Sequence, residues 1–142
     1  MQTTLRISEA ASIALHSMAY LATNAGRLVT SREIVSALRV SDTHLSKVLQ
    51  RLVKVGFIKS IRGPNGGFML SKPPDKITLL NVYESIEGPV AFDECLFGKP
   101  ICGDQGCMLG GLLKTVNNEV RNYLGQTTLS KLNKNSEAKI ES

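Results

Sequence analysis

Apolar residues recur every three or four positions in five stretches of the sequence, and this spacing predicts five helices that each bury one face. The stretches cover residues 8–25, 30–38, 41–56, 78–88 and 108–124. Between the third and the fourth, residues 57–62 and 68–72 flank the turn sequence Gly63-Pro64-Asn65-Gly66-Gly67, which predicts a β-hairpin. The expected fold class is therefore mainly α-helical with one small β-hairpin.

The second and third helices are short and follow each other closely. Thr30 and Glu33 have the spacing of a capping box, in which each side chain accepts a hydrogen bond from the backbone N–H of the other residue. Ser41 is the expected N-cap of the next helix, and Gly56 is placed to end it in a left-handed conformation. The residues expected to face inward are Ile34, Ala37, Leu38, Leu45, Val48, Leu49 and Leu52. Two such helices followed by a hairpin are typical of a winged helix-turn-helix with a hairpin wing.

The other face of the third helix is polar and partly basic, which suits contacts with base edges and phosphates. Any surface helix has a solvated polar face, so this helix alone does not show whether its polar face binds DNA or only faces water. The hairpin favours DNA, because a tip of small residues beside an arginine fits a narrow minor groove. The candidate DNA-binding residues are Thr43, His44, Ser46, Lys47, Gln50, Arg51, Arg62, Gly63, Asn65, Gly66 and Gly67.

The first predicted helix begins at an N-cap, Ser8, and can stop at Gly26. Its apolar side is formed by Ala10, Ala11, Ala14, Met18, Leu21 and Ala22. A second side carries Glu9, Ser12, His16 and Tyr20. A histidine in this setting is either partly exposed with its hydrogen bonds satisfied or buried at a subunit contact.

The last predicted helix has more apolar positions than a small domain needs, at Leu109, Leu112, Leu113, Val116, Val120, Tyr123 and Leu124. It either folds back on its own domain or packs against the same helix of a second chain, and the second arrangement gives a two-fold dimer on a palindromic site. The expected organisation is a DNA-binding domain over 1–88, preceding a loop over 89–107, a dimerisation helix over 108–132 and a disordered tail over 133–142. The dimerisation segment includes a possible last helical turn at 128–132.

Composition agrees with this interpretation. The 142 residues carry a net charge of +5 with a pI near 9.3, and a basic balance favours nucleic acid over acidic substrates. No apolar run reaches membrane-spanning length and no signal peptide is recognisable, so a cytoplasmic protein is expected. Three cysteines cannot form a complete set of internal disulfides, which favours metal or redox chemistry.

Cys95, Cys102 and Cys107 have the spacing C-x6-C-x4-C in a glycine- and aspartate-containing loop. Three thiolates in a short loop can converge on zinc, copper(I) or an iron-sulfur cluster. The alternatives are thiol redox sensing without a metal and plain burial as small apolar residues.

The segment HLSKVLQRLVKVGFIKSIRGPNGGFMLSKP, with LRISEAASIALHSMAYLA before it and ITLLNVYESIEGP after it, resembles the Rrf (type two) family of winged-helix transcription regulators. The resemblance covers roughly residues 5–132. It implies a dimeric, non-enzymatic DNA-binding protein. IscR-like and NsrR-like members carry three cysteines in the corresponding loop and bind a [2Fe-2S] or [4Fe-4S] cluster. CymR-like members lack the three-cysteine loop and sense a thiol metabolite or a partner enzyme.

The resemblance also bears on a fourth cluster ligand. The histidine that follows the third cysteine in IscR-like members is replaced here by Gly110, and the ligand position of NsrR-like members aligns with Ser12. RsrR-like members have a histidine ligand at the position of His16, which makes His16 the candidate here. Glu94, Asp104, Glu9 and an exogenous molecule are the alternatives.

Other classes of function have little support in the sequence. An enzyme with a cysteine nucleophile has only His16 and His44 available as histidine bases, and no nucleophile elbow, phosphate loop or paired carboxylates are present. A zinc-stabilised protein-binding module is the remaining alternative. The expected function is transcription regulation through DNA binding, controlled by an iron-sulfur cluster.

Overall fold

The computed structural model describes residues 7–89 and 109–132. The helices are α1 (Glu9–Thr23), α2 (Ser31–Leu38), α3 (Asp42–Val55), α4 (Leu79–Glu87) and α5 (Gly110–Gln126), with a 3-10 turn η1 at Pro74–Lys76. Strands β1 (Ile58–Ile61) and β2 (Gly67–Leu70) form the hairpin, and residues 129–132 are again helical. The three cysteines and the tail over 133–142 lie outside the described residues.

The predicted helix starts are confirmed by cap hydrogen bonds. The side chains of Ser8, Thr30 and Ser41 each accept a backbone N–H three residues later, at 3.1 Å in all three cases. Gly56 ends α3 with φ 90°, in the left-handed region that glycine adopts without steric cost. Helix α1 ends slightly earlier than expected, because Asn24 takes the C-cap position and its side chain donates to the carbonyl of Tyr20 at 2.9 Å.

Two expectations for α2 are wrong in detail. Thr30 caps the helix, but the carboxylate of Glu33 binds Tyr20 and Arg27 instead of completing the capping box. The Glu33 carboxylate therefore binds the Arg27 guanidinium, in the loop before α2, instead of a backbone N–H at the start of the helix. Ala37 is exposed, whereas Ile34 is fully buried and Leu38 half-buried. The inward face of this two-turn helix is narrower than its apolar spacing predicts.

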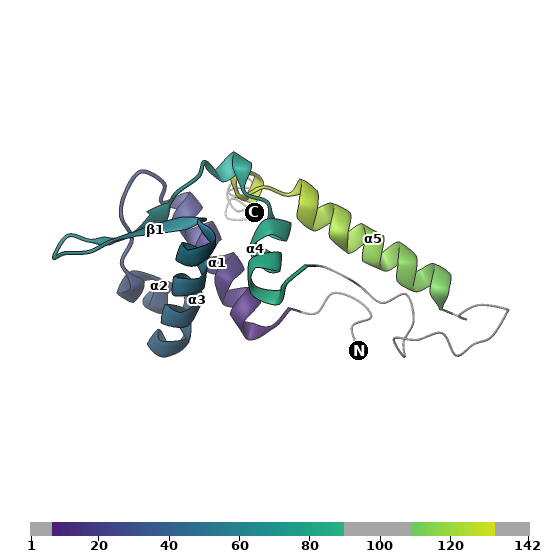
Figure 1. The fold of residues 1–142 in the computed structure, drawn as a ribbon, viewed down its shortest axis with the longest axis horizontal. Helices are drawn as coiled ribbons and strands as arrows, with labels where there is room; N and C mark the ends of the chain where they lie inside the picture. Colours follow the sequence, from purple (N-terminus) through teal and green to yellow (C-terminus); the bar gives the residue numbers. More distant parts are fainter. Residues whose placement is uncertain (1–6, 90–108, 133–142) are drawn as a thin grey trace, which may run out of the picture.

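Helix α1 lies at the centre of the fold and contacts α2, α3, α4 and β2 (Figure 1). Its buried side combines with the inner faces of α3 and α4 in one hydrophobic core. The largest fully buried side chains of that core are Met18, Leu21, Ile34, Leu45, Leu49, Leu52, Ile58, Ile77 and Leu129. Exclusion of this apolar surface from water is the main force that holds the helices together.

The hairpin is joined to the helices by a third extended segment. Strands β1 and β2 are antiparallel with Ile58 opposite Leu70, and Phe68 exchanges two backbone hydrogen bonds with Val29, at 2.9 and 2.7 Å. Glycine is required at two positions here. A Cβ on Gly66 would lie 2.0 Å from the carbonyl oxygen of Ile61, and one on Gly67 would lie 2.8 Å from that of Val29. The residues before α2 and the wing therefore form one rigid unit.

The C-terminal segment returns to the start of α4. Thr78 and Asn81 form a complete capping box, the N–H of Leu79 donates to Thr127 and the N–H of Leu129 donates to Ile77. From this junction α5 extends away from α1, α2 and α3, on the side opposite the hairpin (Figure 1). Within residues 7–89 and 109–132, no helix is both long and apolar enough to span a bilayer.

Candidate nucleic-acid interface

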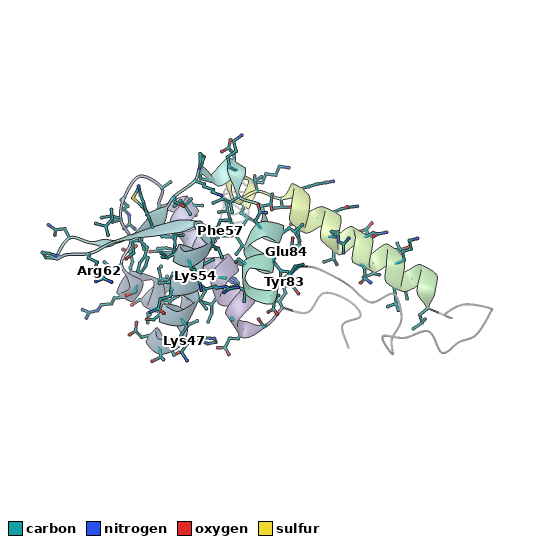
Figure 2. All side chains as sticks on the ribbon, viewed as in Figure 1. Lys47, Lys54, Phe57, Arg62, Tyr83 and Glu84 are labelled. Atoms are coloured by element: carbon teal, nitrogen blue, oxygen red, sulfur yellow. The ribbon has the colours of Figure 1, made fainter. Side chains whose placement is uncertain are left out.

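The outer face of α3 is available to a ligand along its whole length. Thr43, Lys47 and Gln50 are exposed, Ser46 is partly exposed, and Figure 2 shows Lys47 and Lys54 along the helix. The opposite face is held in place because Leu45, Val48, Leu49 and Leu52 are at most 4% exposed. A helix anchored in this way presents hydroxyl, amide and ammonium groups in fixed positions.

Two of the predicted contact residues of α3 also bind other parts of the chain. The Nδ1 atom of His44 lies 3.5 Å from Oε1 of Glu9, and the Nε–H of Arg51 donates to the carbonyl oxygen of Ser85 in α4 at 2.9 Å. These contacts join residues 34 or more positions apart, so sequence spacing gives no signal for them. Arg51 stays exposed, and its bond to α4 leaves the terminal guanidinium nitrogens available.

The wing presents a small, basic tip. Arg62, Gly63 and Asn65 are exposed, and the N–H of Gly66 donates to the carbonyl of Gly63 at 3.0 Å, which closes the turn. Gly66 and Gly67 are partly covered and have the structural role described above. At the base of the wing, the ammonium of Lys72 lies 5.6 Å from the centre of the Phe57 ring. Figure 2 shows Arg62 on the hairpin, separate from the lysines of α3.

A polar cluster that the sequence analysis missed fixes α2 relative to α1. Glu33 accepts hydrogen bonds from the Tyr20 hydroxyl at 2.7 Å and from both terminal nitrogens of Arg27, at 2.5 and 3.1 Å. The Arg27 hydrogen bonds, followed by that from Tyr20, lower the pKa of Glu33 to about 2. The bond to this carboxylate raises the pKa of Tyr20. The three residues are far enough apart that no local motif reveals them.

His16 lies on the exposed side of α1, as one of the two sequence interpretations expected. Its Nδ1 is 2.7 Å from the backbone carbonyl oxygen of Ser12, which can only accept a hydrogen bond. In the neutral imidazole the proton is therefore on Nδ1, and the free lone pair is on Nε2. His16 also lines a cavity of about 150 Å³ together with Ser12, Ile13, Leu38 and Val40. Among the described residues, no group of three or more His, Cys, Asp or Glu side chains could hold a metal ion.

The sequence profile of the Rrf2 family, described as "Iron-dependent Transcriptional regulator", matches residues 7–135. The chain belongs to the Rrf2 family. The NsrR regulator of Bacillus licheniformis is 33% identical over 107 residues, which cover 70% of this chain and 75% of that protein. The IscR regulator of Xenorhabdus nematophila is 30% identical over 99 residues, covering 69% of this chain and 60% of that protein. Both are named HTH-type transcriptional regulators.

Among solved structures, CymR, "the Global Cysteine Regulator of B. subtilis", superimposes with a TM-score of 0.78 at 28% identity, covering 90% of this chain and 95% of CymR. The predicted fold class and family are thus confirmed, and the chain is a transcriptional regulator, not an enzyme. Rrf2 membership also supports DNA binding.

Proposed function

We propose that this Rrf2-family regulator binds palindromic DNA as a homodimer, with α3 in the major groove and the wing at the minor groove. The observation that supports this most directly is the exposed polar face of α3 beside a glycine-rich wing with Arg62 at its tip. The buried face of α3 and the Val29–Phe68 pairing give both elements fixed positions. A cytoplasmic location follows from this function.

The side chains of the interface divide by chemistry. Thr43, Ser46 and Gln50 can exchange hydrogen bonds with base edges, whereas Lys47 suits phosphates. Arg62, with Gly63, Asn65, Gly66 and Gly67, suits a narrow minor groove. His44 in the first turn of α3 and Arg51 in its second half would bind backbone phosphates, next to their contacts with Glu9 and Ser85. Some IscR-like members carry a glutamate at the position of Ser46, so a different sequence preference is expected here.

Arg62→Ala tests the wing. A duplex selected from a random library by the wild-type chain serves as the probe in fluorescence anisotropy. Loss of a base or narrow-groove contact should cost about 1–3 kcal/mol of binding free energy. Lys114→Ala, on the exposed surface of α5, removes the same charge and should bind like wild type. Equal affinities of the two variants for the duplex would show that Arg62 does not contact DNA.

The dimer proposal rests on the two sides of α5. Leu113, Asn117 and Leu124 are buried, while Leu112 and Tyr123 are each 59% exposed. Leu112 and Tyr123 are eleven residues apart, which is about three helical turns, so they share one outer face. A groove of about 450 Å³ runs beside this face and includes Ile7, Leu15, Leu79, Val120 and Tyr123. A second chain packed against the outer face would bury these apolar groups.

The regulatory part of the proposal is an iron-sulfur cluster held by Cys95, Cys102, Cys107 and His16. The three cysteines supply the thiolate chemistry that such clusters require. His16 fits a fourth position because its Nδ1–H bond to Ser12 leaves Nε2 on an exposed side of α1. A bound [2Fe-2S] or [4Fe-4S] cluster would supply a redox-sensitive centre, and a histidine ligand raises its reduction potential relative to thiolate.

Anaerobic reconstitution tests this assignment. The wild type, the three single Cys→Ala variants and His16→Ala are compared by visible absorption, resonance Raman spectra and affinity for the selected duplex. Each cysteine variant should fail to hold a normal cluster, and His16→Ala should hold one with an altered spectrum. If all three cysteine variants reconstitute like wild type, the loop is not the site. If only His16→Ala does so, the fourth ligand is another group.

The alternative is a regulator of the same fold that senses a thiol or a metabolite without a metal. The likeness to the CymR structure favours it, and the three-cysteine loop favours the cluster. A wild-type chain purified anaerobically without visible absorption, but with DNA affinity that changes on thiol oxidation, would establish the alternative. A zinc-stabilised protein-binding module would bind zinc and no duplex.

A further inference from the structure

Helix α2 carries a basic stripe that lies outside both α3 and the wing. Arg32 and Ser36 are one turn apart on one face of the helix, and Arg39 follows at its C-cap. All three are exposed. The stripe is opposite the side of α2 that buries Ile34 against the core.

Arg32 and Arg39 differ from Arg27 and Arg51, whose side chains bind other residues of the chain. Arg27 binds Glu33 and Asn24, and Arg51 binds the carbonyl of Ser85. Neither Arg32 nor Arg39 makes a side-chain hydrogen bond or ion pair with any residue in 7–89 or 109–132. Their guanidinium groups therefore have all five N–H donors free for a ligand.

Arg39 also adopts a backbone conformation that arginine disfavours. It is the C-cap of α2 with φ 56° and ψ 46°, and it is the only non-glycine residue with positive φ in the described part of the chain. Glycine is the usual residue at such a left-handed cap, because it has no Cβ to clash with the backbone. Arginine at this position lowers the stability of the fold. A role of its side chain other than stabilising the turn would explain its presence.

The position of Arg39 supplies that explanation. Arg39 stands two residues before Ser41, the N-cap of α3, and the first helix of a helix-turn-helix crosses the DNA backbone when the second enters the major groove. We propose that Arg32 and Arg39 bind two phosphates of the strand that borders this groove. Seven residues of helix separate them by about 10 Å. Two long arginine side chains at this separation can reach two different phosphates of the strand.

The test is the salt dependence of binding to the selected duplex, and it rests on the DNA binding proposed above. Each phosphate contact contributes about 0.9 to the slope of log affinity against log salt. Because both chains of the proposed dimer carry the change, the double variant Arg32→Gln/Arg39→Gln removes four phosphate contacts, so it should lower the slope by about 3.6 and weaken binding more than about tenfold at moderate salt. It should leave the preferred DNA sequence unchanged, because phosphates carry no base identity.

The matched control is Lys76→Gln/Lys114→Gln, which removes two charges from the exposed surfaces of η1 and α5. A wild-type slope in the Arg32→Gln/Arg39→Gln variant, or an equal loss in the control, would overturn the proposal. Absence of any duplex binding by the wild type would instead overturn the DNA-binding proposal itself.

Arg39→Gly separates binding from folding, because it relieves the left-handed strain and removes the guanidinium. It should unfold at a higher temperature than wild type and bind the duplex more weakly. Arg39→Lys should retain most of the slope. A higher unfolding temperature with unchanged binding would show that Arg39 is only tolerated at the turn.

Discussion

Single residues in this chain show where the core is not optimised for stability. Ser17 on α1 is fully buried, and its hydroxyl has no hydrogen-bond partner among the described residues. A buried hydroxyl without a partner loses its hydration and gains nothing in return. Alanine, which has no hydroxyl to leave without a partner, would suit this buried position better.

We therefore expect Ser17→Ala to raise the free energy of unfolding by about 1 kcal/mol, from the removed hydroxyl and the higher helix propensity of alanine. Urea unfolding followed by circular dichroism measures the change. Ser85→Ala in α4 is the control, because its hydroxyl donates to the carbonyl of Val82 at 2.6 Å. A Ser17→Ala variant less stable than wild type would mean that the hydroxyl has a partner.

The charge of Glu33 links α2 to Tyr20 of α1 and to Arg27. Its pKa is lowered from 4.5 to about 2 by hydrogen bonds from Arg27 and Tyr20. A carboxyl with a lowered folded-state pKa stabilises the fold above its unfolded pKa, and this contribution is lost as pH falls toward the folded value. The contribution is thus complete near neutral pH and disappears between about pH 4.5 and 2.

Glu33→Gln should accordingly destabilise the fold at pH 7, with a difference from wild type that shrinks steadily as pH is lowered from 5 to 2. Urea unfolding at four or five pH values follows this difference. Tyr20→Phe removes only one of the hydrogen bonds and should give a smaller effect at neutral pH. A difference that does not change with pH would show that the Glu33 carboxylate is not held by charge-assisted bonds.

At the scale of elements, most of the secondary structure could be predicted because its signals are local. Ser8, Thr30, Ser41 and Thr78 each bind a backbone N–H three residues away, and Gly56 fixes a helix end by its own conformation. Such contacts follow from sequence spacing alone. The predicted boundaries of α3 and α4 accordingly agree with the structure to within a few residues.

Long-range contacts could not be predicted in the same way. The pairing of Val29 with Phe68 joins residues 39 positions apart, and the contact of Arg51 with Ser85 joins residues 34 positions apart. Neither follows from apolar spacing, because each depends on how whole elements pack. For the same reason, the spacing of Thr30 and Glu33 predicts a local capping box, whereas the carboxylate of Glu33 binds Arg27 and Tyr20.

The wing gives an element-scale prediction. Gly66→Ala would place a Cβ 2.0 Å from the Ile61 carbonyl, so the hairpin backbone must move. We expect a loss of stability of about 1–3 kcal/mol and weaker binding to the selected duplex. Thermal unfolding and anisotropy measure the two effects. The neighbouring exposed substitution Asn65→Ala should leave stability near wild type, and an equally mild effect of Gly66→Ala would contradict the described path of the turn.

For the whole molecule, the open question is how two DNA-binding domains are held together, and α5 is the element that decides it. Its inner face, with Leu113 and Leu124, is buried in its own chain, so substitutions there would disturb folding and association together. The outer face, with Leu112 and Tyr123, is largely exposed in the isolated chain. Substitutions on the outer face therefore test association alone.

We expect Leu112→Asp/Tyr123→Asp to be a folded monomer, since each carboxylate would be buried between two apolar faces at a cost of several kcal/mol. Sedimentation velocity measures the association state, and circular dichroism checks folding. The control Asn118→Asp/Asn122→Asp adds the same two charges on exposed positions of another face of α5 and should stay dimeric. Because a dimer aligns two recognition helices on a palindrome, the monomer should bind a half-site and the selected duplex with similar, weak affinity. A dimeric Leu112→Asp/Tyr123→Asp variant with full affinity would show that the outer face of α5 does not hold the two chains together.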